Sequence, residues 1–332
     1  MNSMHILDMP DDCLLMVFHN LDLMSQCNFA FTCARFRVIY DMVYKQHFRC
    51  FTWYEPTNHW TTLEVEEFFQ LNGHKMRMLA VSDLQEKYFE LPLISKANHM
   101  INVCVYLKNL QSLILSIDHK LVDIIIEVCK HLHKLENLVV DCASHPNYEF
   151  LVLLPCLKSL DINYFVNPHD KVFQRFAELR PDALEHVRIG SEITMKQGKY
   201  IAHLRRLTLL NVYNPCYHFF NGVVLQLLNL RVLSITSAQE LRWHDFRHLV
   251  MHLTFLSTLY IIQCSDIGNE FILFVIQHLN AEMERSVNSR RLPFHLELSE
   301  TSVTDDINEI EPIKSSHSLL KVVLKNMENY AN

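Results

Sequence analysis

The sequence predicts an α/β solenoid that follows a small N-terminal unit of three helices. Short helical patterns occupy residues 9–48, and a leucine-x-x-leucine-x-leucine spacing then returns at steps of about 20 to 30 residues almost to the C-terminus. The chain has 332 residues, of which 49% are hydrophobic and 20% charged. This composition is sufficient for a buried core and is not that of a disordered chain.

The leucine spacing has seven clear copies, and their first residues are 25, 22, 27, 20, 26 and 26 residues apart. The mean step of about 24 residues lies within the range of leucine-rich repeats. The last two apolar residues of a copy alternate along a short strand, so both point into one core. The clear copies begin at Leu110, Leu135, Leu157, Leu184, Leu204, Leu230 and Leu256, and weaker copies begin at Met76 and Leu319.

Helical patterns lie between the copies, as in residues 118–132 and 266–279. Repeated strand and helix segments require parallel strands joined by right-handed crossovers. We therefore expect a horseshoe with a parallel sheet on its concave side and helices on its convex side. This array of about ten repeats is expected to span residues 63–326, followed by a C-terminal tail at 327–332.

The N-terminal unit begins with a helix that suits its sequence, since Pro10 fits a first helical turn and acidic Asp11 and Asp12 favour the positive helix end. Asp22 or Ser25 can cap the second helix. About 40 residues bury too little apolar surface to be stable alone. Because its helices carry apolar residues on more than one face, we expect a partner, the repeat array or both to cover this unit.

Residues 1–48 resemble an F-box. The residues that carry the resemblance are Met9-Pro10, the acidic pair that follows, Leu14-Leu15, Phe18, Leu21-Asp22-Leu23 and Cys33-Ala34-Arg35-Phe36. Met9 replaces the usual leucine, and Phe36 stands where many members have tryptophan. An F-box followed by leucine-rich repeats is the layout of the F-box/leucine-rich-repeat family.

The resemblance implies a non-catalytic subunit without a cofactor, which recognises substrates for an SCF-type cullin–RING ubiquitin ligase. The F-box would bind the Skp adaptor and, through it, a cullin and a RING subunit, while the repeats would present a protein substrate for ubiquitination and proteasomal degradation. The adaptor-facing residues carried over from the family are Met9, Pro10, Leu14, Val17, Phe18, Leu21, Leu23, Cys33 and Phe36. Each of these residues also suits the core of the N-terminal unit itself.

Residues beside the inward-pointing leucines are candidates for substrate contact on the concave face, although polar alternation is typical of any half-exposed strand. They are Asp141, Asp161, Asn163, His186, Arg188, Arg206, Thr236 and Tyr260. Residues 49–62 are rich in aromatic side chains, and we expect them to form a rigid joint. Thr61 and Glu64 offer a capping box for the helix that follows the joint.

Charge and composition argue against several other classes of function. The net charge of −7 and the lack of a long basic block do not favour nucleic-acid binding. No apolar run approaches the ~18 residues of a membrane helix, so no membrane partner is expected. The ten cysteines form no C-x-x-C motif, which favours reduced thiols and a cytoplasmic or nuclear location.

Two alternatives remain from the sequence. One is an interaction scaffold that binds Skp, or acts through its repeats, without a role in degradation. The other is a metal hydrolase, because His244, His248 and His252 would share one helix face at the spacing of a zinc site. We expect no metal there, since that helix belongs on the convex side, where no cleft excludes water.

Overall fold

The computed structural model describes residues 6–44, 47–53, 60–81, 101–116, 122–141, 148–163, 171–285, 293–304 and 319–325. The expected tail at 327–332 and residues 54–59 of the expected joint lie outside this part of the chain. Strands pair in chain order from β1 to β11, and each pair that the structure describes is parallel. The predicted architecture of three helices followed by a parallel repeat sheet is therefore confirmed.

The chain divides into two compact units. The first holds the helices α1 (Asp11–His19), α2 (Leu23–Thr32), α3 (Ala34–Tyr44), α4 (Thr62–Asn72) and α6 (Val122–Cys129), with the strands β1 (Cys50–Trp53), β2 (Met78–Val81) and β3 (Ser112–Ser116). The second holds most of β4 (Asn137–Asp141), then β5 (Ser159–Ile162), β6 (His186–Ile189), β7 (Leu209–Tyr213), β8 (Val232–Thr236), β9 (Thr258–Cys264), β10 (Phe294–Thr301) and β11 (Leu320–Lys325). Its helices are α7 (Val172–Leu179), α8 (Met195–Ile201), α9 (Tyr217–Gly222), α10 (Trp243–His252) and α11 (Asn269–Glu284).

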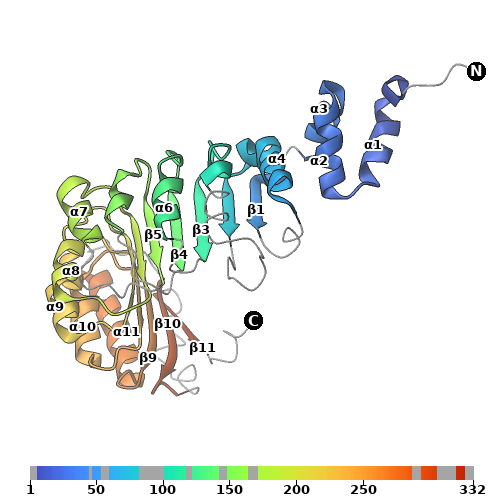
Figure 1. The fold of residues 1–332 in the computed structure, drawn as a ribbon. Coiled ribbons are helices and arrows are strands. Elements are labelled where there is room, and N and C mark those ends of the chain that lie inside the picture. Colours follow the sequence, from blue (N-terminus) through green and yellow to red (C-terminus); the bar gives the residue numbers. More distant parts are fainter. Residues whose placement is uncertain are drawn as a thin grey trace, which may run out of the picture. The chain divides into compact units, whose positions relative to one another are not determined.

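In the second unit, helices α7 to α11 cover one face of the strands (Figure 1). Alternation along the strands explains this layering. In β5, Leu160 and Ile162 are buried, whereas Ser159 and Asp161 between them are partly exposed on the opposite face. Because successive side chains of a strand point to opposite faces, one apolar row per repeat builds the core beneath the helices.

One repeat copy lies three residues further along the chain than the sequence predicts. The predicted copy used Leu204, Leu207 and Leu209, but β7 begins at Leu209 and buries Leu210 and Val212. Leucines at 204, 207 and 210 share a spacing of three, so the pattern fits two registers equally well. Arg206 therefore precedes the strand instead of flanking it.

The sheet begins inside the segment that the sequence marked as a joint. β1 pairs in parallel with β2, with Phe51 opposite Leu79. Phe51 also packs on Phe68 of α4, at 4.9 Å between ring centroids, and Trp60 lies 5.1 Å from the same ring. The predicted capping box is present at the start of α4, where Thr61 and Glu64 bind each other's backbone amides.

Candidate functional site

The three N-terminal helices enclose a small core that uses several of the predicted adaptor-facing residues. Leu14, Phe18 and Phe36 are buried, and the ring of Phe36 stacks on Phe29 at 3.8 Å. Leu21, Leu23 and Cys33 are partly exposed. The buried residues among them hold the three helices together. This is the second role that we expected from the sequence, as part of the core of the N-terminal unit.

Arg35 connects the start of this unit to α3. Its guanidinium donates to the Met9 carbonyl at 2.7 Å and to the Asp11 carboxylate at 2.5 Å, and it also binds the carbonyl of Leu7. Asp22 caps α2, accepting from the backbone amide of Ser25 at 3.0 Å. The residues around Pro10, which is exposed, are thus held in a defined conformation at the surface.

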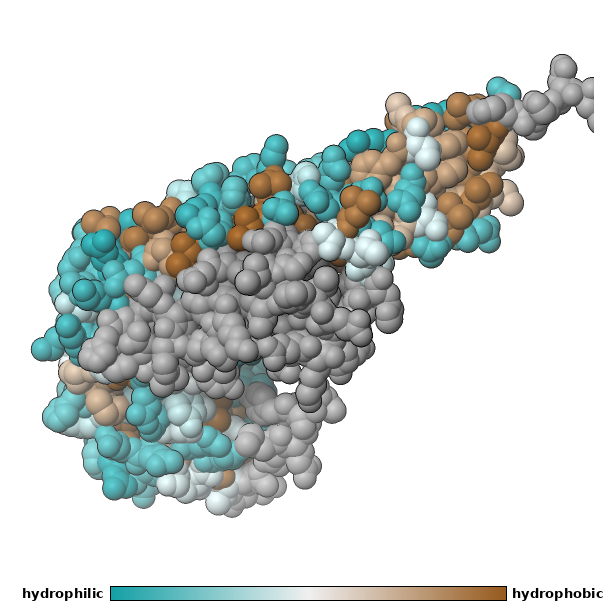
Figure 2. Space-filling model, in the orientation of Figure 1, coloured by the Kyte–Doolittle hydropathy of each residue, from teal (hydrophilic) through white to brown (hydrophobic). Residues whose placement is uncertain are grey.

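Apolar side chains remain exposed on all three N-terminal helices, and apolar surface is visible there in Figure 2. Met16 is 69% exposed on α1 and Met42 is 62% exposed on α3. Scattered exposed apolar residues are ordinary, but a concentration in a unit of this size indicates a protein contact. We call these residues the apolar surface of the N-terminal unit; they are Ile6, Leu7, Met16, Val17, Phe31, Val38 and Met42.

The predicted substrate-facing residues of the strands fall into rows, because parallel strands in register place equivalent positions side by side. One row crosses β5 to β10 and contains Asp161, Arg188, Asn211, Ser234, Tyr260 and Glu297. Three of the predicted residues, Asp161, Arg188 and Tyr260, thus share this row. His186 and Thr236 belong to neighbouring rows, and Asn163 follows β5, where its backbone amide donates to Val140 beside Asp141.

Asp161 and Arg188 form the one charged pair among these predicted residues, with 3.7 Å between Oδ2 and Nη1. The Asp161 side chain is mostly buried, and its Oδ1 atom has no hydrogen-bond partner among the residues that the structure describes. Burial raises the pKa of Asp161 above its ordinary value, and the Arg188 charge opposes that rise. A desolvated carboxylate with an incomplete set of hydrogen bonds is a place where a ligand's donor would fit.

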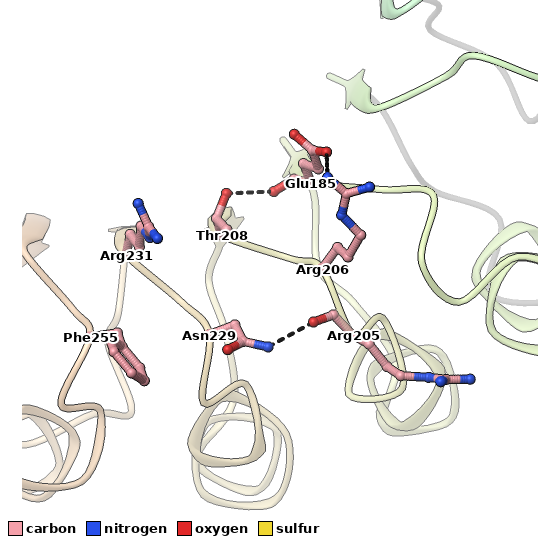
Figure 3. A pocket seen from close by; sticks show the side chains of 7 residues that line it. All are labelled: Glu185, Arg205, Arg206, Thr208, Asn229, Arg231 and Phe255. Carbon is pink, nitrogen blue, oxygen red and sulfur yellow. Dashed lines mark hydrogen bonds and ion pairs between the residues drawn. The ribbon is translucent and has the colours of Figure 1, made fainter. Parts of the chain in front are cut away.

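Arg206 lies in a different place, in a pocket of about 490 Å³ at the edge where β6 to β9 begin. Figure 3 shows Glu185 and Arg206 on one side of the pocket and Arg231 with Phe255 on the other. We call it the arginine pocket; its lining residues are Glu185, Arg205, Arg206, Thr208, Asn229, Arg231 and Phe255.

Sequence reasoning missed most of this pocket. Arg205, Arg231 and Phe255 lie one to four residues before their strands, outside the leucine spacing that directed attention to the strand faces. The signal that could have found them is the repeat itself, since the residues that precede successive parallel strands lie at one edge of the sheet.

The candidate metal ligands are all exposed on α10: His244, His248 and His252. Asp245, the would-be base of a zinc-peptidase motif, instead accepts from the backbone amide of Arg242 at 2.8 Å. Within the residues that the structure describes, no three histidine, cysteine or acidic side chains gather where a metal ion could be held. In the same residues, no helix is both long and apolar enough to cross a bilayer.

Comparison with known proteins identifies the N-terminal unit. Residues 6–44 match the family described as F-box domain, so these three helices are an F-box, a protein-interaction module. None of the curated protein sequences matches the chain.

Solved structures with a similar trace include two bacterial proteins. An internalin from Listeria monocytogenes is 17% identical with a TM-score of 0.41, and the alignment covers 80% of this chain and 70% of the internalin. A protein from Bacteroides fragilis is 13% identical with a TM-score of 0.42, covering 83% of this chain and 74% of that one. The repeat architecture of the present chain rests on its own strand pairing and burial.

Proposed function

We propose that the chain is a substrate-recognition subunit of an SCF-type ubiquitin ligase, in which the F-box binds a Skp adaptor and the repeats hold a protein substrate. The observation that carries the proposal is an F-box in which Leu14, Phe18 and Phe36 are buried, while its apolar surface has no cover in the described residues. F-box domains generally bind Skp-type adaptors, and the cullin and RING subunits would follow through the adaptor. Ubiquitin transfer would then depend on the raised effective concentration of substrate lysines.

The adaptor contact can be assigned to particular residues. Of the positions carried over from the family, Pro10 and Val17 are exposed, and Met16 and Met42 add apolar area on α1 and α3. Leu14, Phe18 and Phe36 would act indirectly by fixing the helices. Hot spots of interfaces are apolar or aromatic anchors that become fully desolvated, a description that fits the exposed set.

The experiment is co-purification of the chain with Skp and cullin from cells. Val17→Asp or Met42→Asp should reduce the recovered adaptor to background, because each places a charge in a desolvated contact. Leu63→Asp is the matched control: Leu63 is 63% exposed on α4, outside the F-box, and its replacement should leave recovery unchanged. Recovery that is the same for all three variants would argue against the assigned surface.

A scaffold without a role in degradation is the second candidate, and it makes the same adaptor contact. The two functions differ in what happens to bound proteins. If proteins captured by the repeats become more abundant when the chain is deleted, or when Val17→Asp replaces it, the ligase subunit is supported. Bound proteins whose levels and ubiquitination never change would favour the scaffold.

A further inference from the structure

We propose that the arginine pocket holds an acidic segment of a protein ligand, with a carboxylate or phosphate group at Arg231 and an apolar neighbouring side chain on Phe255. This inference rests on the proposed function and deepens it, because it states what kind of substrate segment the repeats would recognise. It moves the expected contact from the strand face to the edge where the strands begin.

The pocket is built on a fixed ladder of main-chain hydrogen bonds. The backbone amide of Thr208 donates to the Glu185 carbonyl at 2.8 Å, that of Arg231 to Thr208 at 2.8 Å, and that of Ser257 to Arg231 at 2.9 Å. Asn229 adds a brace, its Nδ2 donating to the Arg205 carbonyl at 2.8 Å. Because these bonds fix the backbone of the lining residues, a ligand would have to order only side chains such as that of Arg231, which lowers the entropic cost of binding.

The residues that line the pocket carry a net positive charge, unlike the chain as a whole. Three arginines and one glutamate line it, although the whole sequence carries a net charge of −7. Arg206 is paired with Glu185, and Arg205 lies 3.9 Å from Asp182. The exposed side chain of Arg231 forms no hydrogen bond or ion pair with the residues that the structure describes.

Arg231 is therefore the group most available to a ligand. Its planar guanidinium suits two-point binding of carboxylate or phosphate oxygens. Phe255, 45% exposed on the next repeat, supplies an apolar contact beside that charge. A peptide can provide both groups together, whereas a nucleic-acid backbone would need a longer basic track than three arginines in an acidic chain.

The test is fluorescence anisotropy of the full chain with three labelled peptides of equal length. The first is rich in glutamate with one central leucine, the second replaces two glutamates by phosphoserine, and the third replaces every glutamate by glutamine. We expect both acidic peptides to bind, more weakly as salt rises, and the glutamine peptide not to bind. The tighter of the two acidic peptides identifies the preferred anion.

Substitutions test whether the peptides bind at the arginine pocket. Arg231→Gln removes a charge-assisted hydrogen bond and should weaken peptide binding. Arg231→Glu also repels the acidic peptide and should weaken binding by about tenfold or more. Phe255→Ala should weaken binding of the leucine peptide but not of a version with serine in place of leucine. Lys196→Glu, the same charge change at an exposed position of α8, should have no effect.

Three outcomes would overturn the inference. In the first, Lys196→Glu weakens peptide binding as much as Arg231→Glu does. In the second, the glutamine peptide binds as tightly as the acidic peptides. The third is tighter binding of a single-stranded oligonucleotide at the same pocket. Adaptor binding is measured on the same variants. A chain that binds the acidic peptides but no adaptor contradicts only the proposed function. A chain that binds the adaptor but no acidic peptide contradicts only the inference about the pocket.

Discussion

The phenol of Tyr40 and the side-chain amide of Asn72 bind each other inside the first unit, with 2.7 Å between Asn72 Nδ2 and Tyr40 Oη. Tyr40 belongs to the last F-box helix and Asn72 ends α4, and both side chains are fully buried. Asn72 also donates to the Phe68 carbonyl at 3.1 Å, and Lys75 pairs with Asp41 at 2.5 Å nearby. The F-box is therefore fastened to the first repeat by polar contacts as well as by the aromatic cluster around Phe68.

Removing the Tyr40 hydroxyl should destabilise the chain. Tyr40→Phe leaves the Asn72 amide without one of its buried partners, at a cost of about 1 to 3 kcal/mol in the free energy of unfolding. Urea denaturation followed by circular dichroism measures this change. Tyr217→Phe, at an exposed tyrosine, is the control and should be neutral. Equal effects of the two substitutions would show that the Tyr40–Asn72 contact contributes nothing.

Cysteine reactivity should follow burial. Burial raises the pKa of the Cys27 thiol to about 11 and that of Cys129 to about 12, so neither is a thiolate at neutral pH. Iodoacetamide at pH 7.5 should therefore label the exposed Cys50 and Cys156 first, and reach Cys27 and Cys129 only after unfolding. Peptide mass spectrometry gives the order, and early labelling of Cys27 would contradict the packing of the F-box.

The same shift predicts a loss of stability in alkaline solution. A thiol whose folded-state pKa is raised contributes stability that is complete below its unfolded-state pKa and is lost as the pH rises through the folded value. For Cys27 that window runs from about pH 9 to about pH 11. Cys27→Ala should flatten the decline in the free energy of unfolding across this window, whereas Cys50→Ala should leave its slope unchanged.

Asp161 should respond to pH in the acidic range. Because burial raises its folded-state pKa, its contribution to stability is complete below the ordinary aspartate value of 3.8 and is lost as the pH rises through the folded value. Asp161→Asn removes that loss, so this variant should be more stable than the parent at pH 7 and equal to it at low pH. Urea titrations at both pH values test the difference.

Asp266→Asn is the matched control for Asp161. The Asp266 carboxylate accepts from the Trp243 amide at 2.7 Å and lies 3.5 Å from Arg242, so neutralising it should give no gain at pH 7. A gain in both variants would reflect the net charge of the chain instead of the buried site.

Close packing of neighbouring repeats predicts opposite effects at two helical glycines. A Cβ added at Gly198 of α8 would lie 2.6 Å from the ring of buried Phe219, so Gly198→Ala should cost about 1 to 3 kcal/mol. At Gly222 the nearest atom, Cε of Met195, is 3.6 Å away, and Gly222→Ala should stabilise by up to about 1 kcal/mol. Thermal unfolding of the two variants distinguishes them by sign.

Much of the fold could be predicted from local rules. Asp22, one of the two residues expected to cap the second helix, does so, and the Thr61–Glu64 box formed as expected. Both features depend only on neighbours in the chain. The apolar rows of the strands are periodic enough to be read directly, except where Leu204, Leu207 and Leu210 permit two registers. The strand β1 was missed because Phe51 and Trp53 carry no leucine spacing.

The candidate sites were harder to predict because they depend on what packing leaves uncovered. Leu14, Val17 and Phe18 look alike in a helical pattern, yet only Val17 is exposed. Arg231 and Phe255 meet only because parallel pairing aligns the residues before successive strands. Whether a side chain belongs to a core or to a surface is a property of the assembled repeats, which a single periodic pattern does not contain.

The central claim is that the F-box surface receives a Skp adaptor, and isothermal titration calorimetry of the full chain with purified adaptor tests it directly. The account predicts one adaptor per chain with a dissociation constant of about a micromolar or tighter, lost in Val17→Asp and kept in Leu63→Asp. Absence of binding by the folded parent chain, or equal affinity of Val17→Asp, would contradict it.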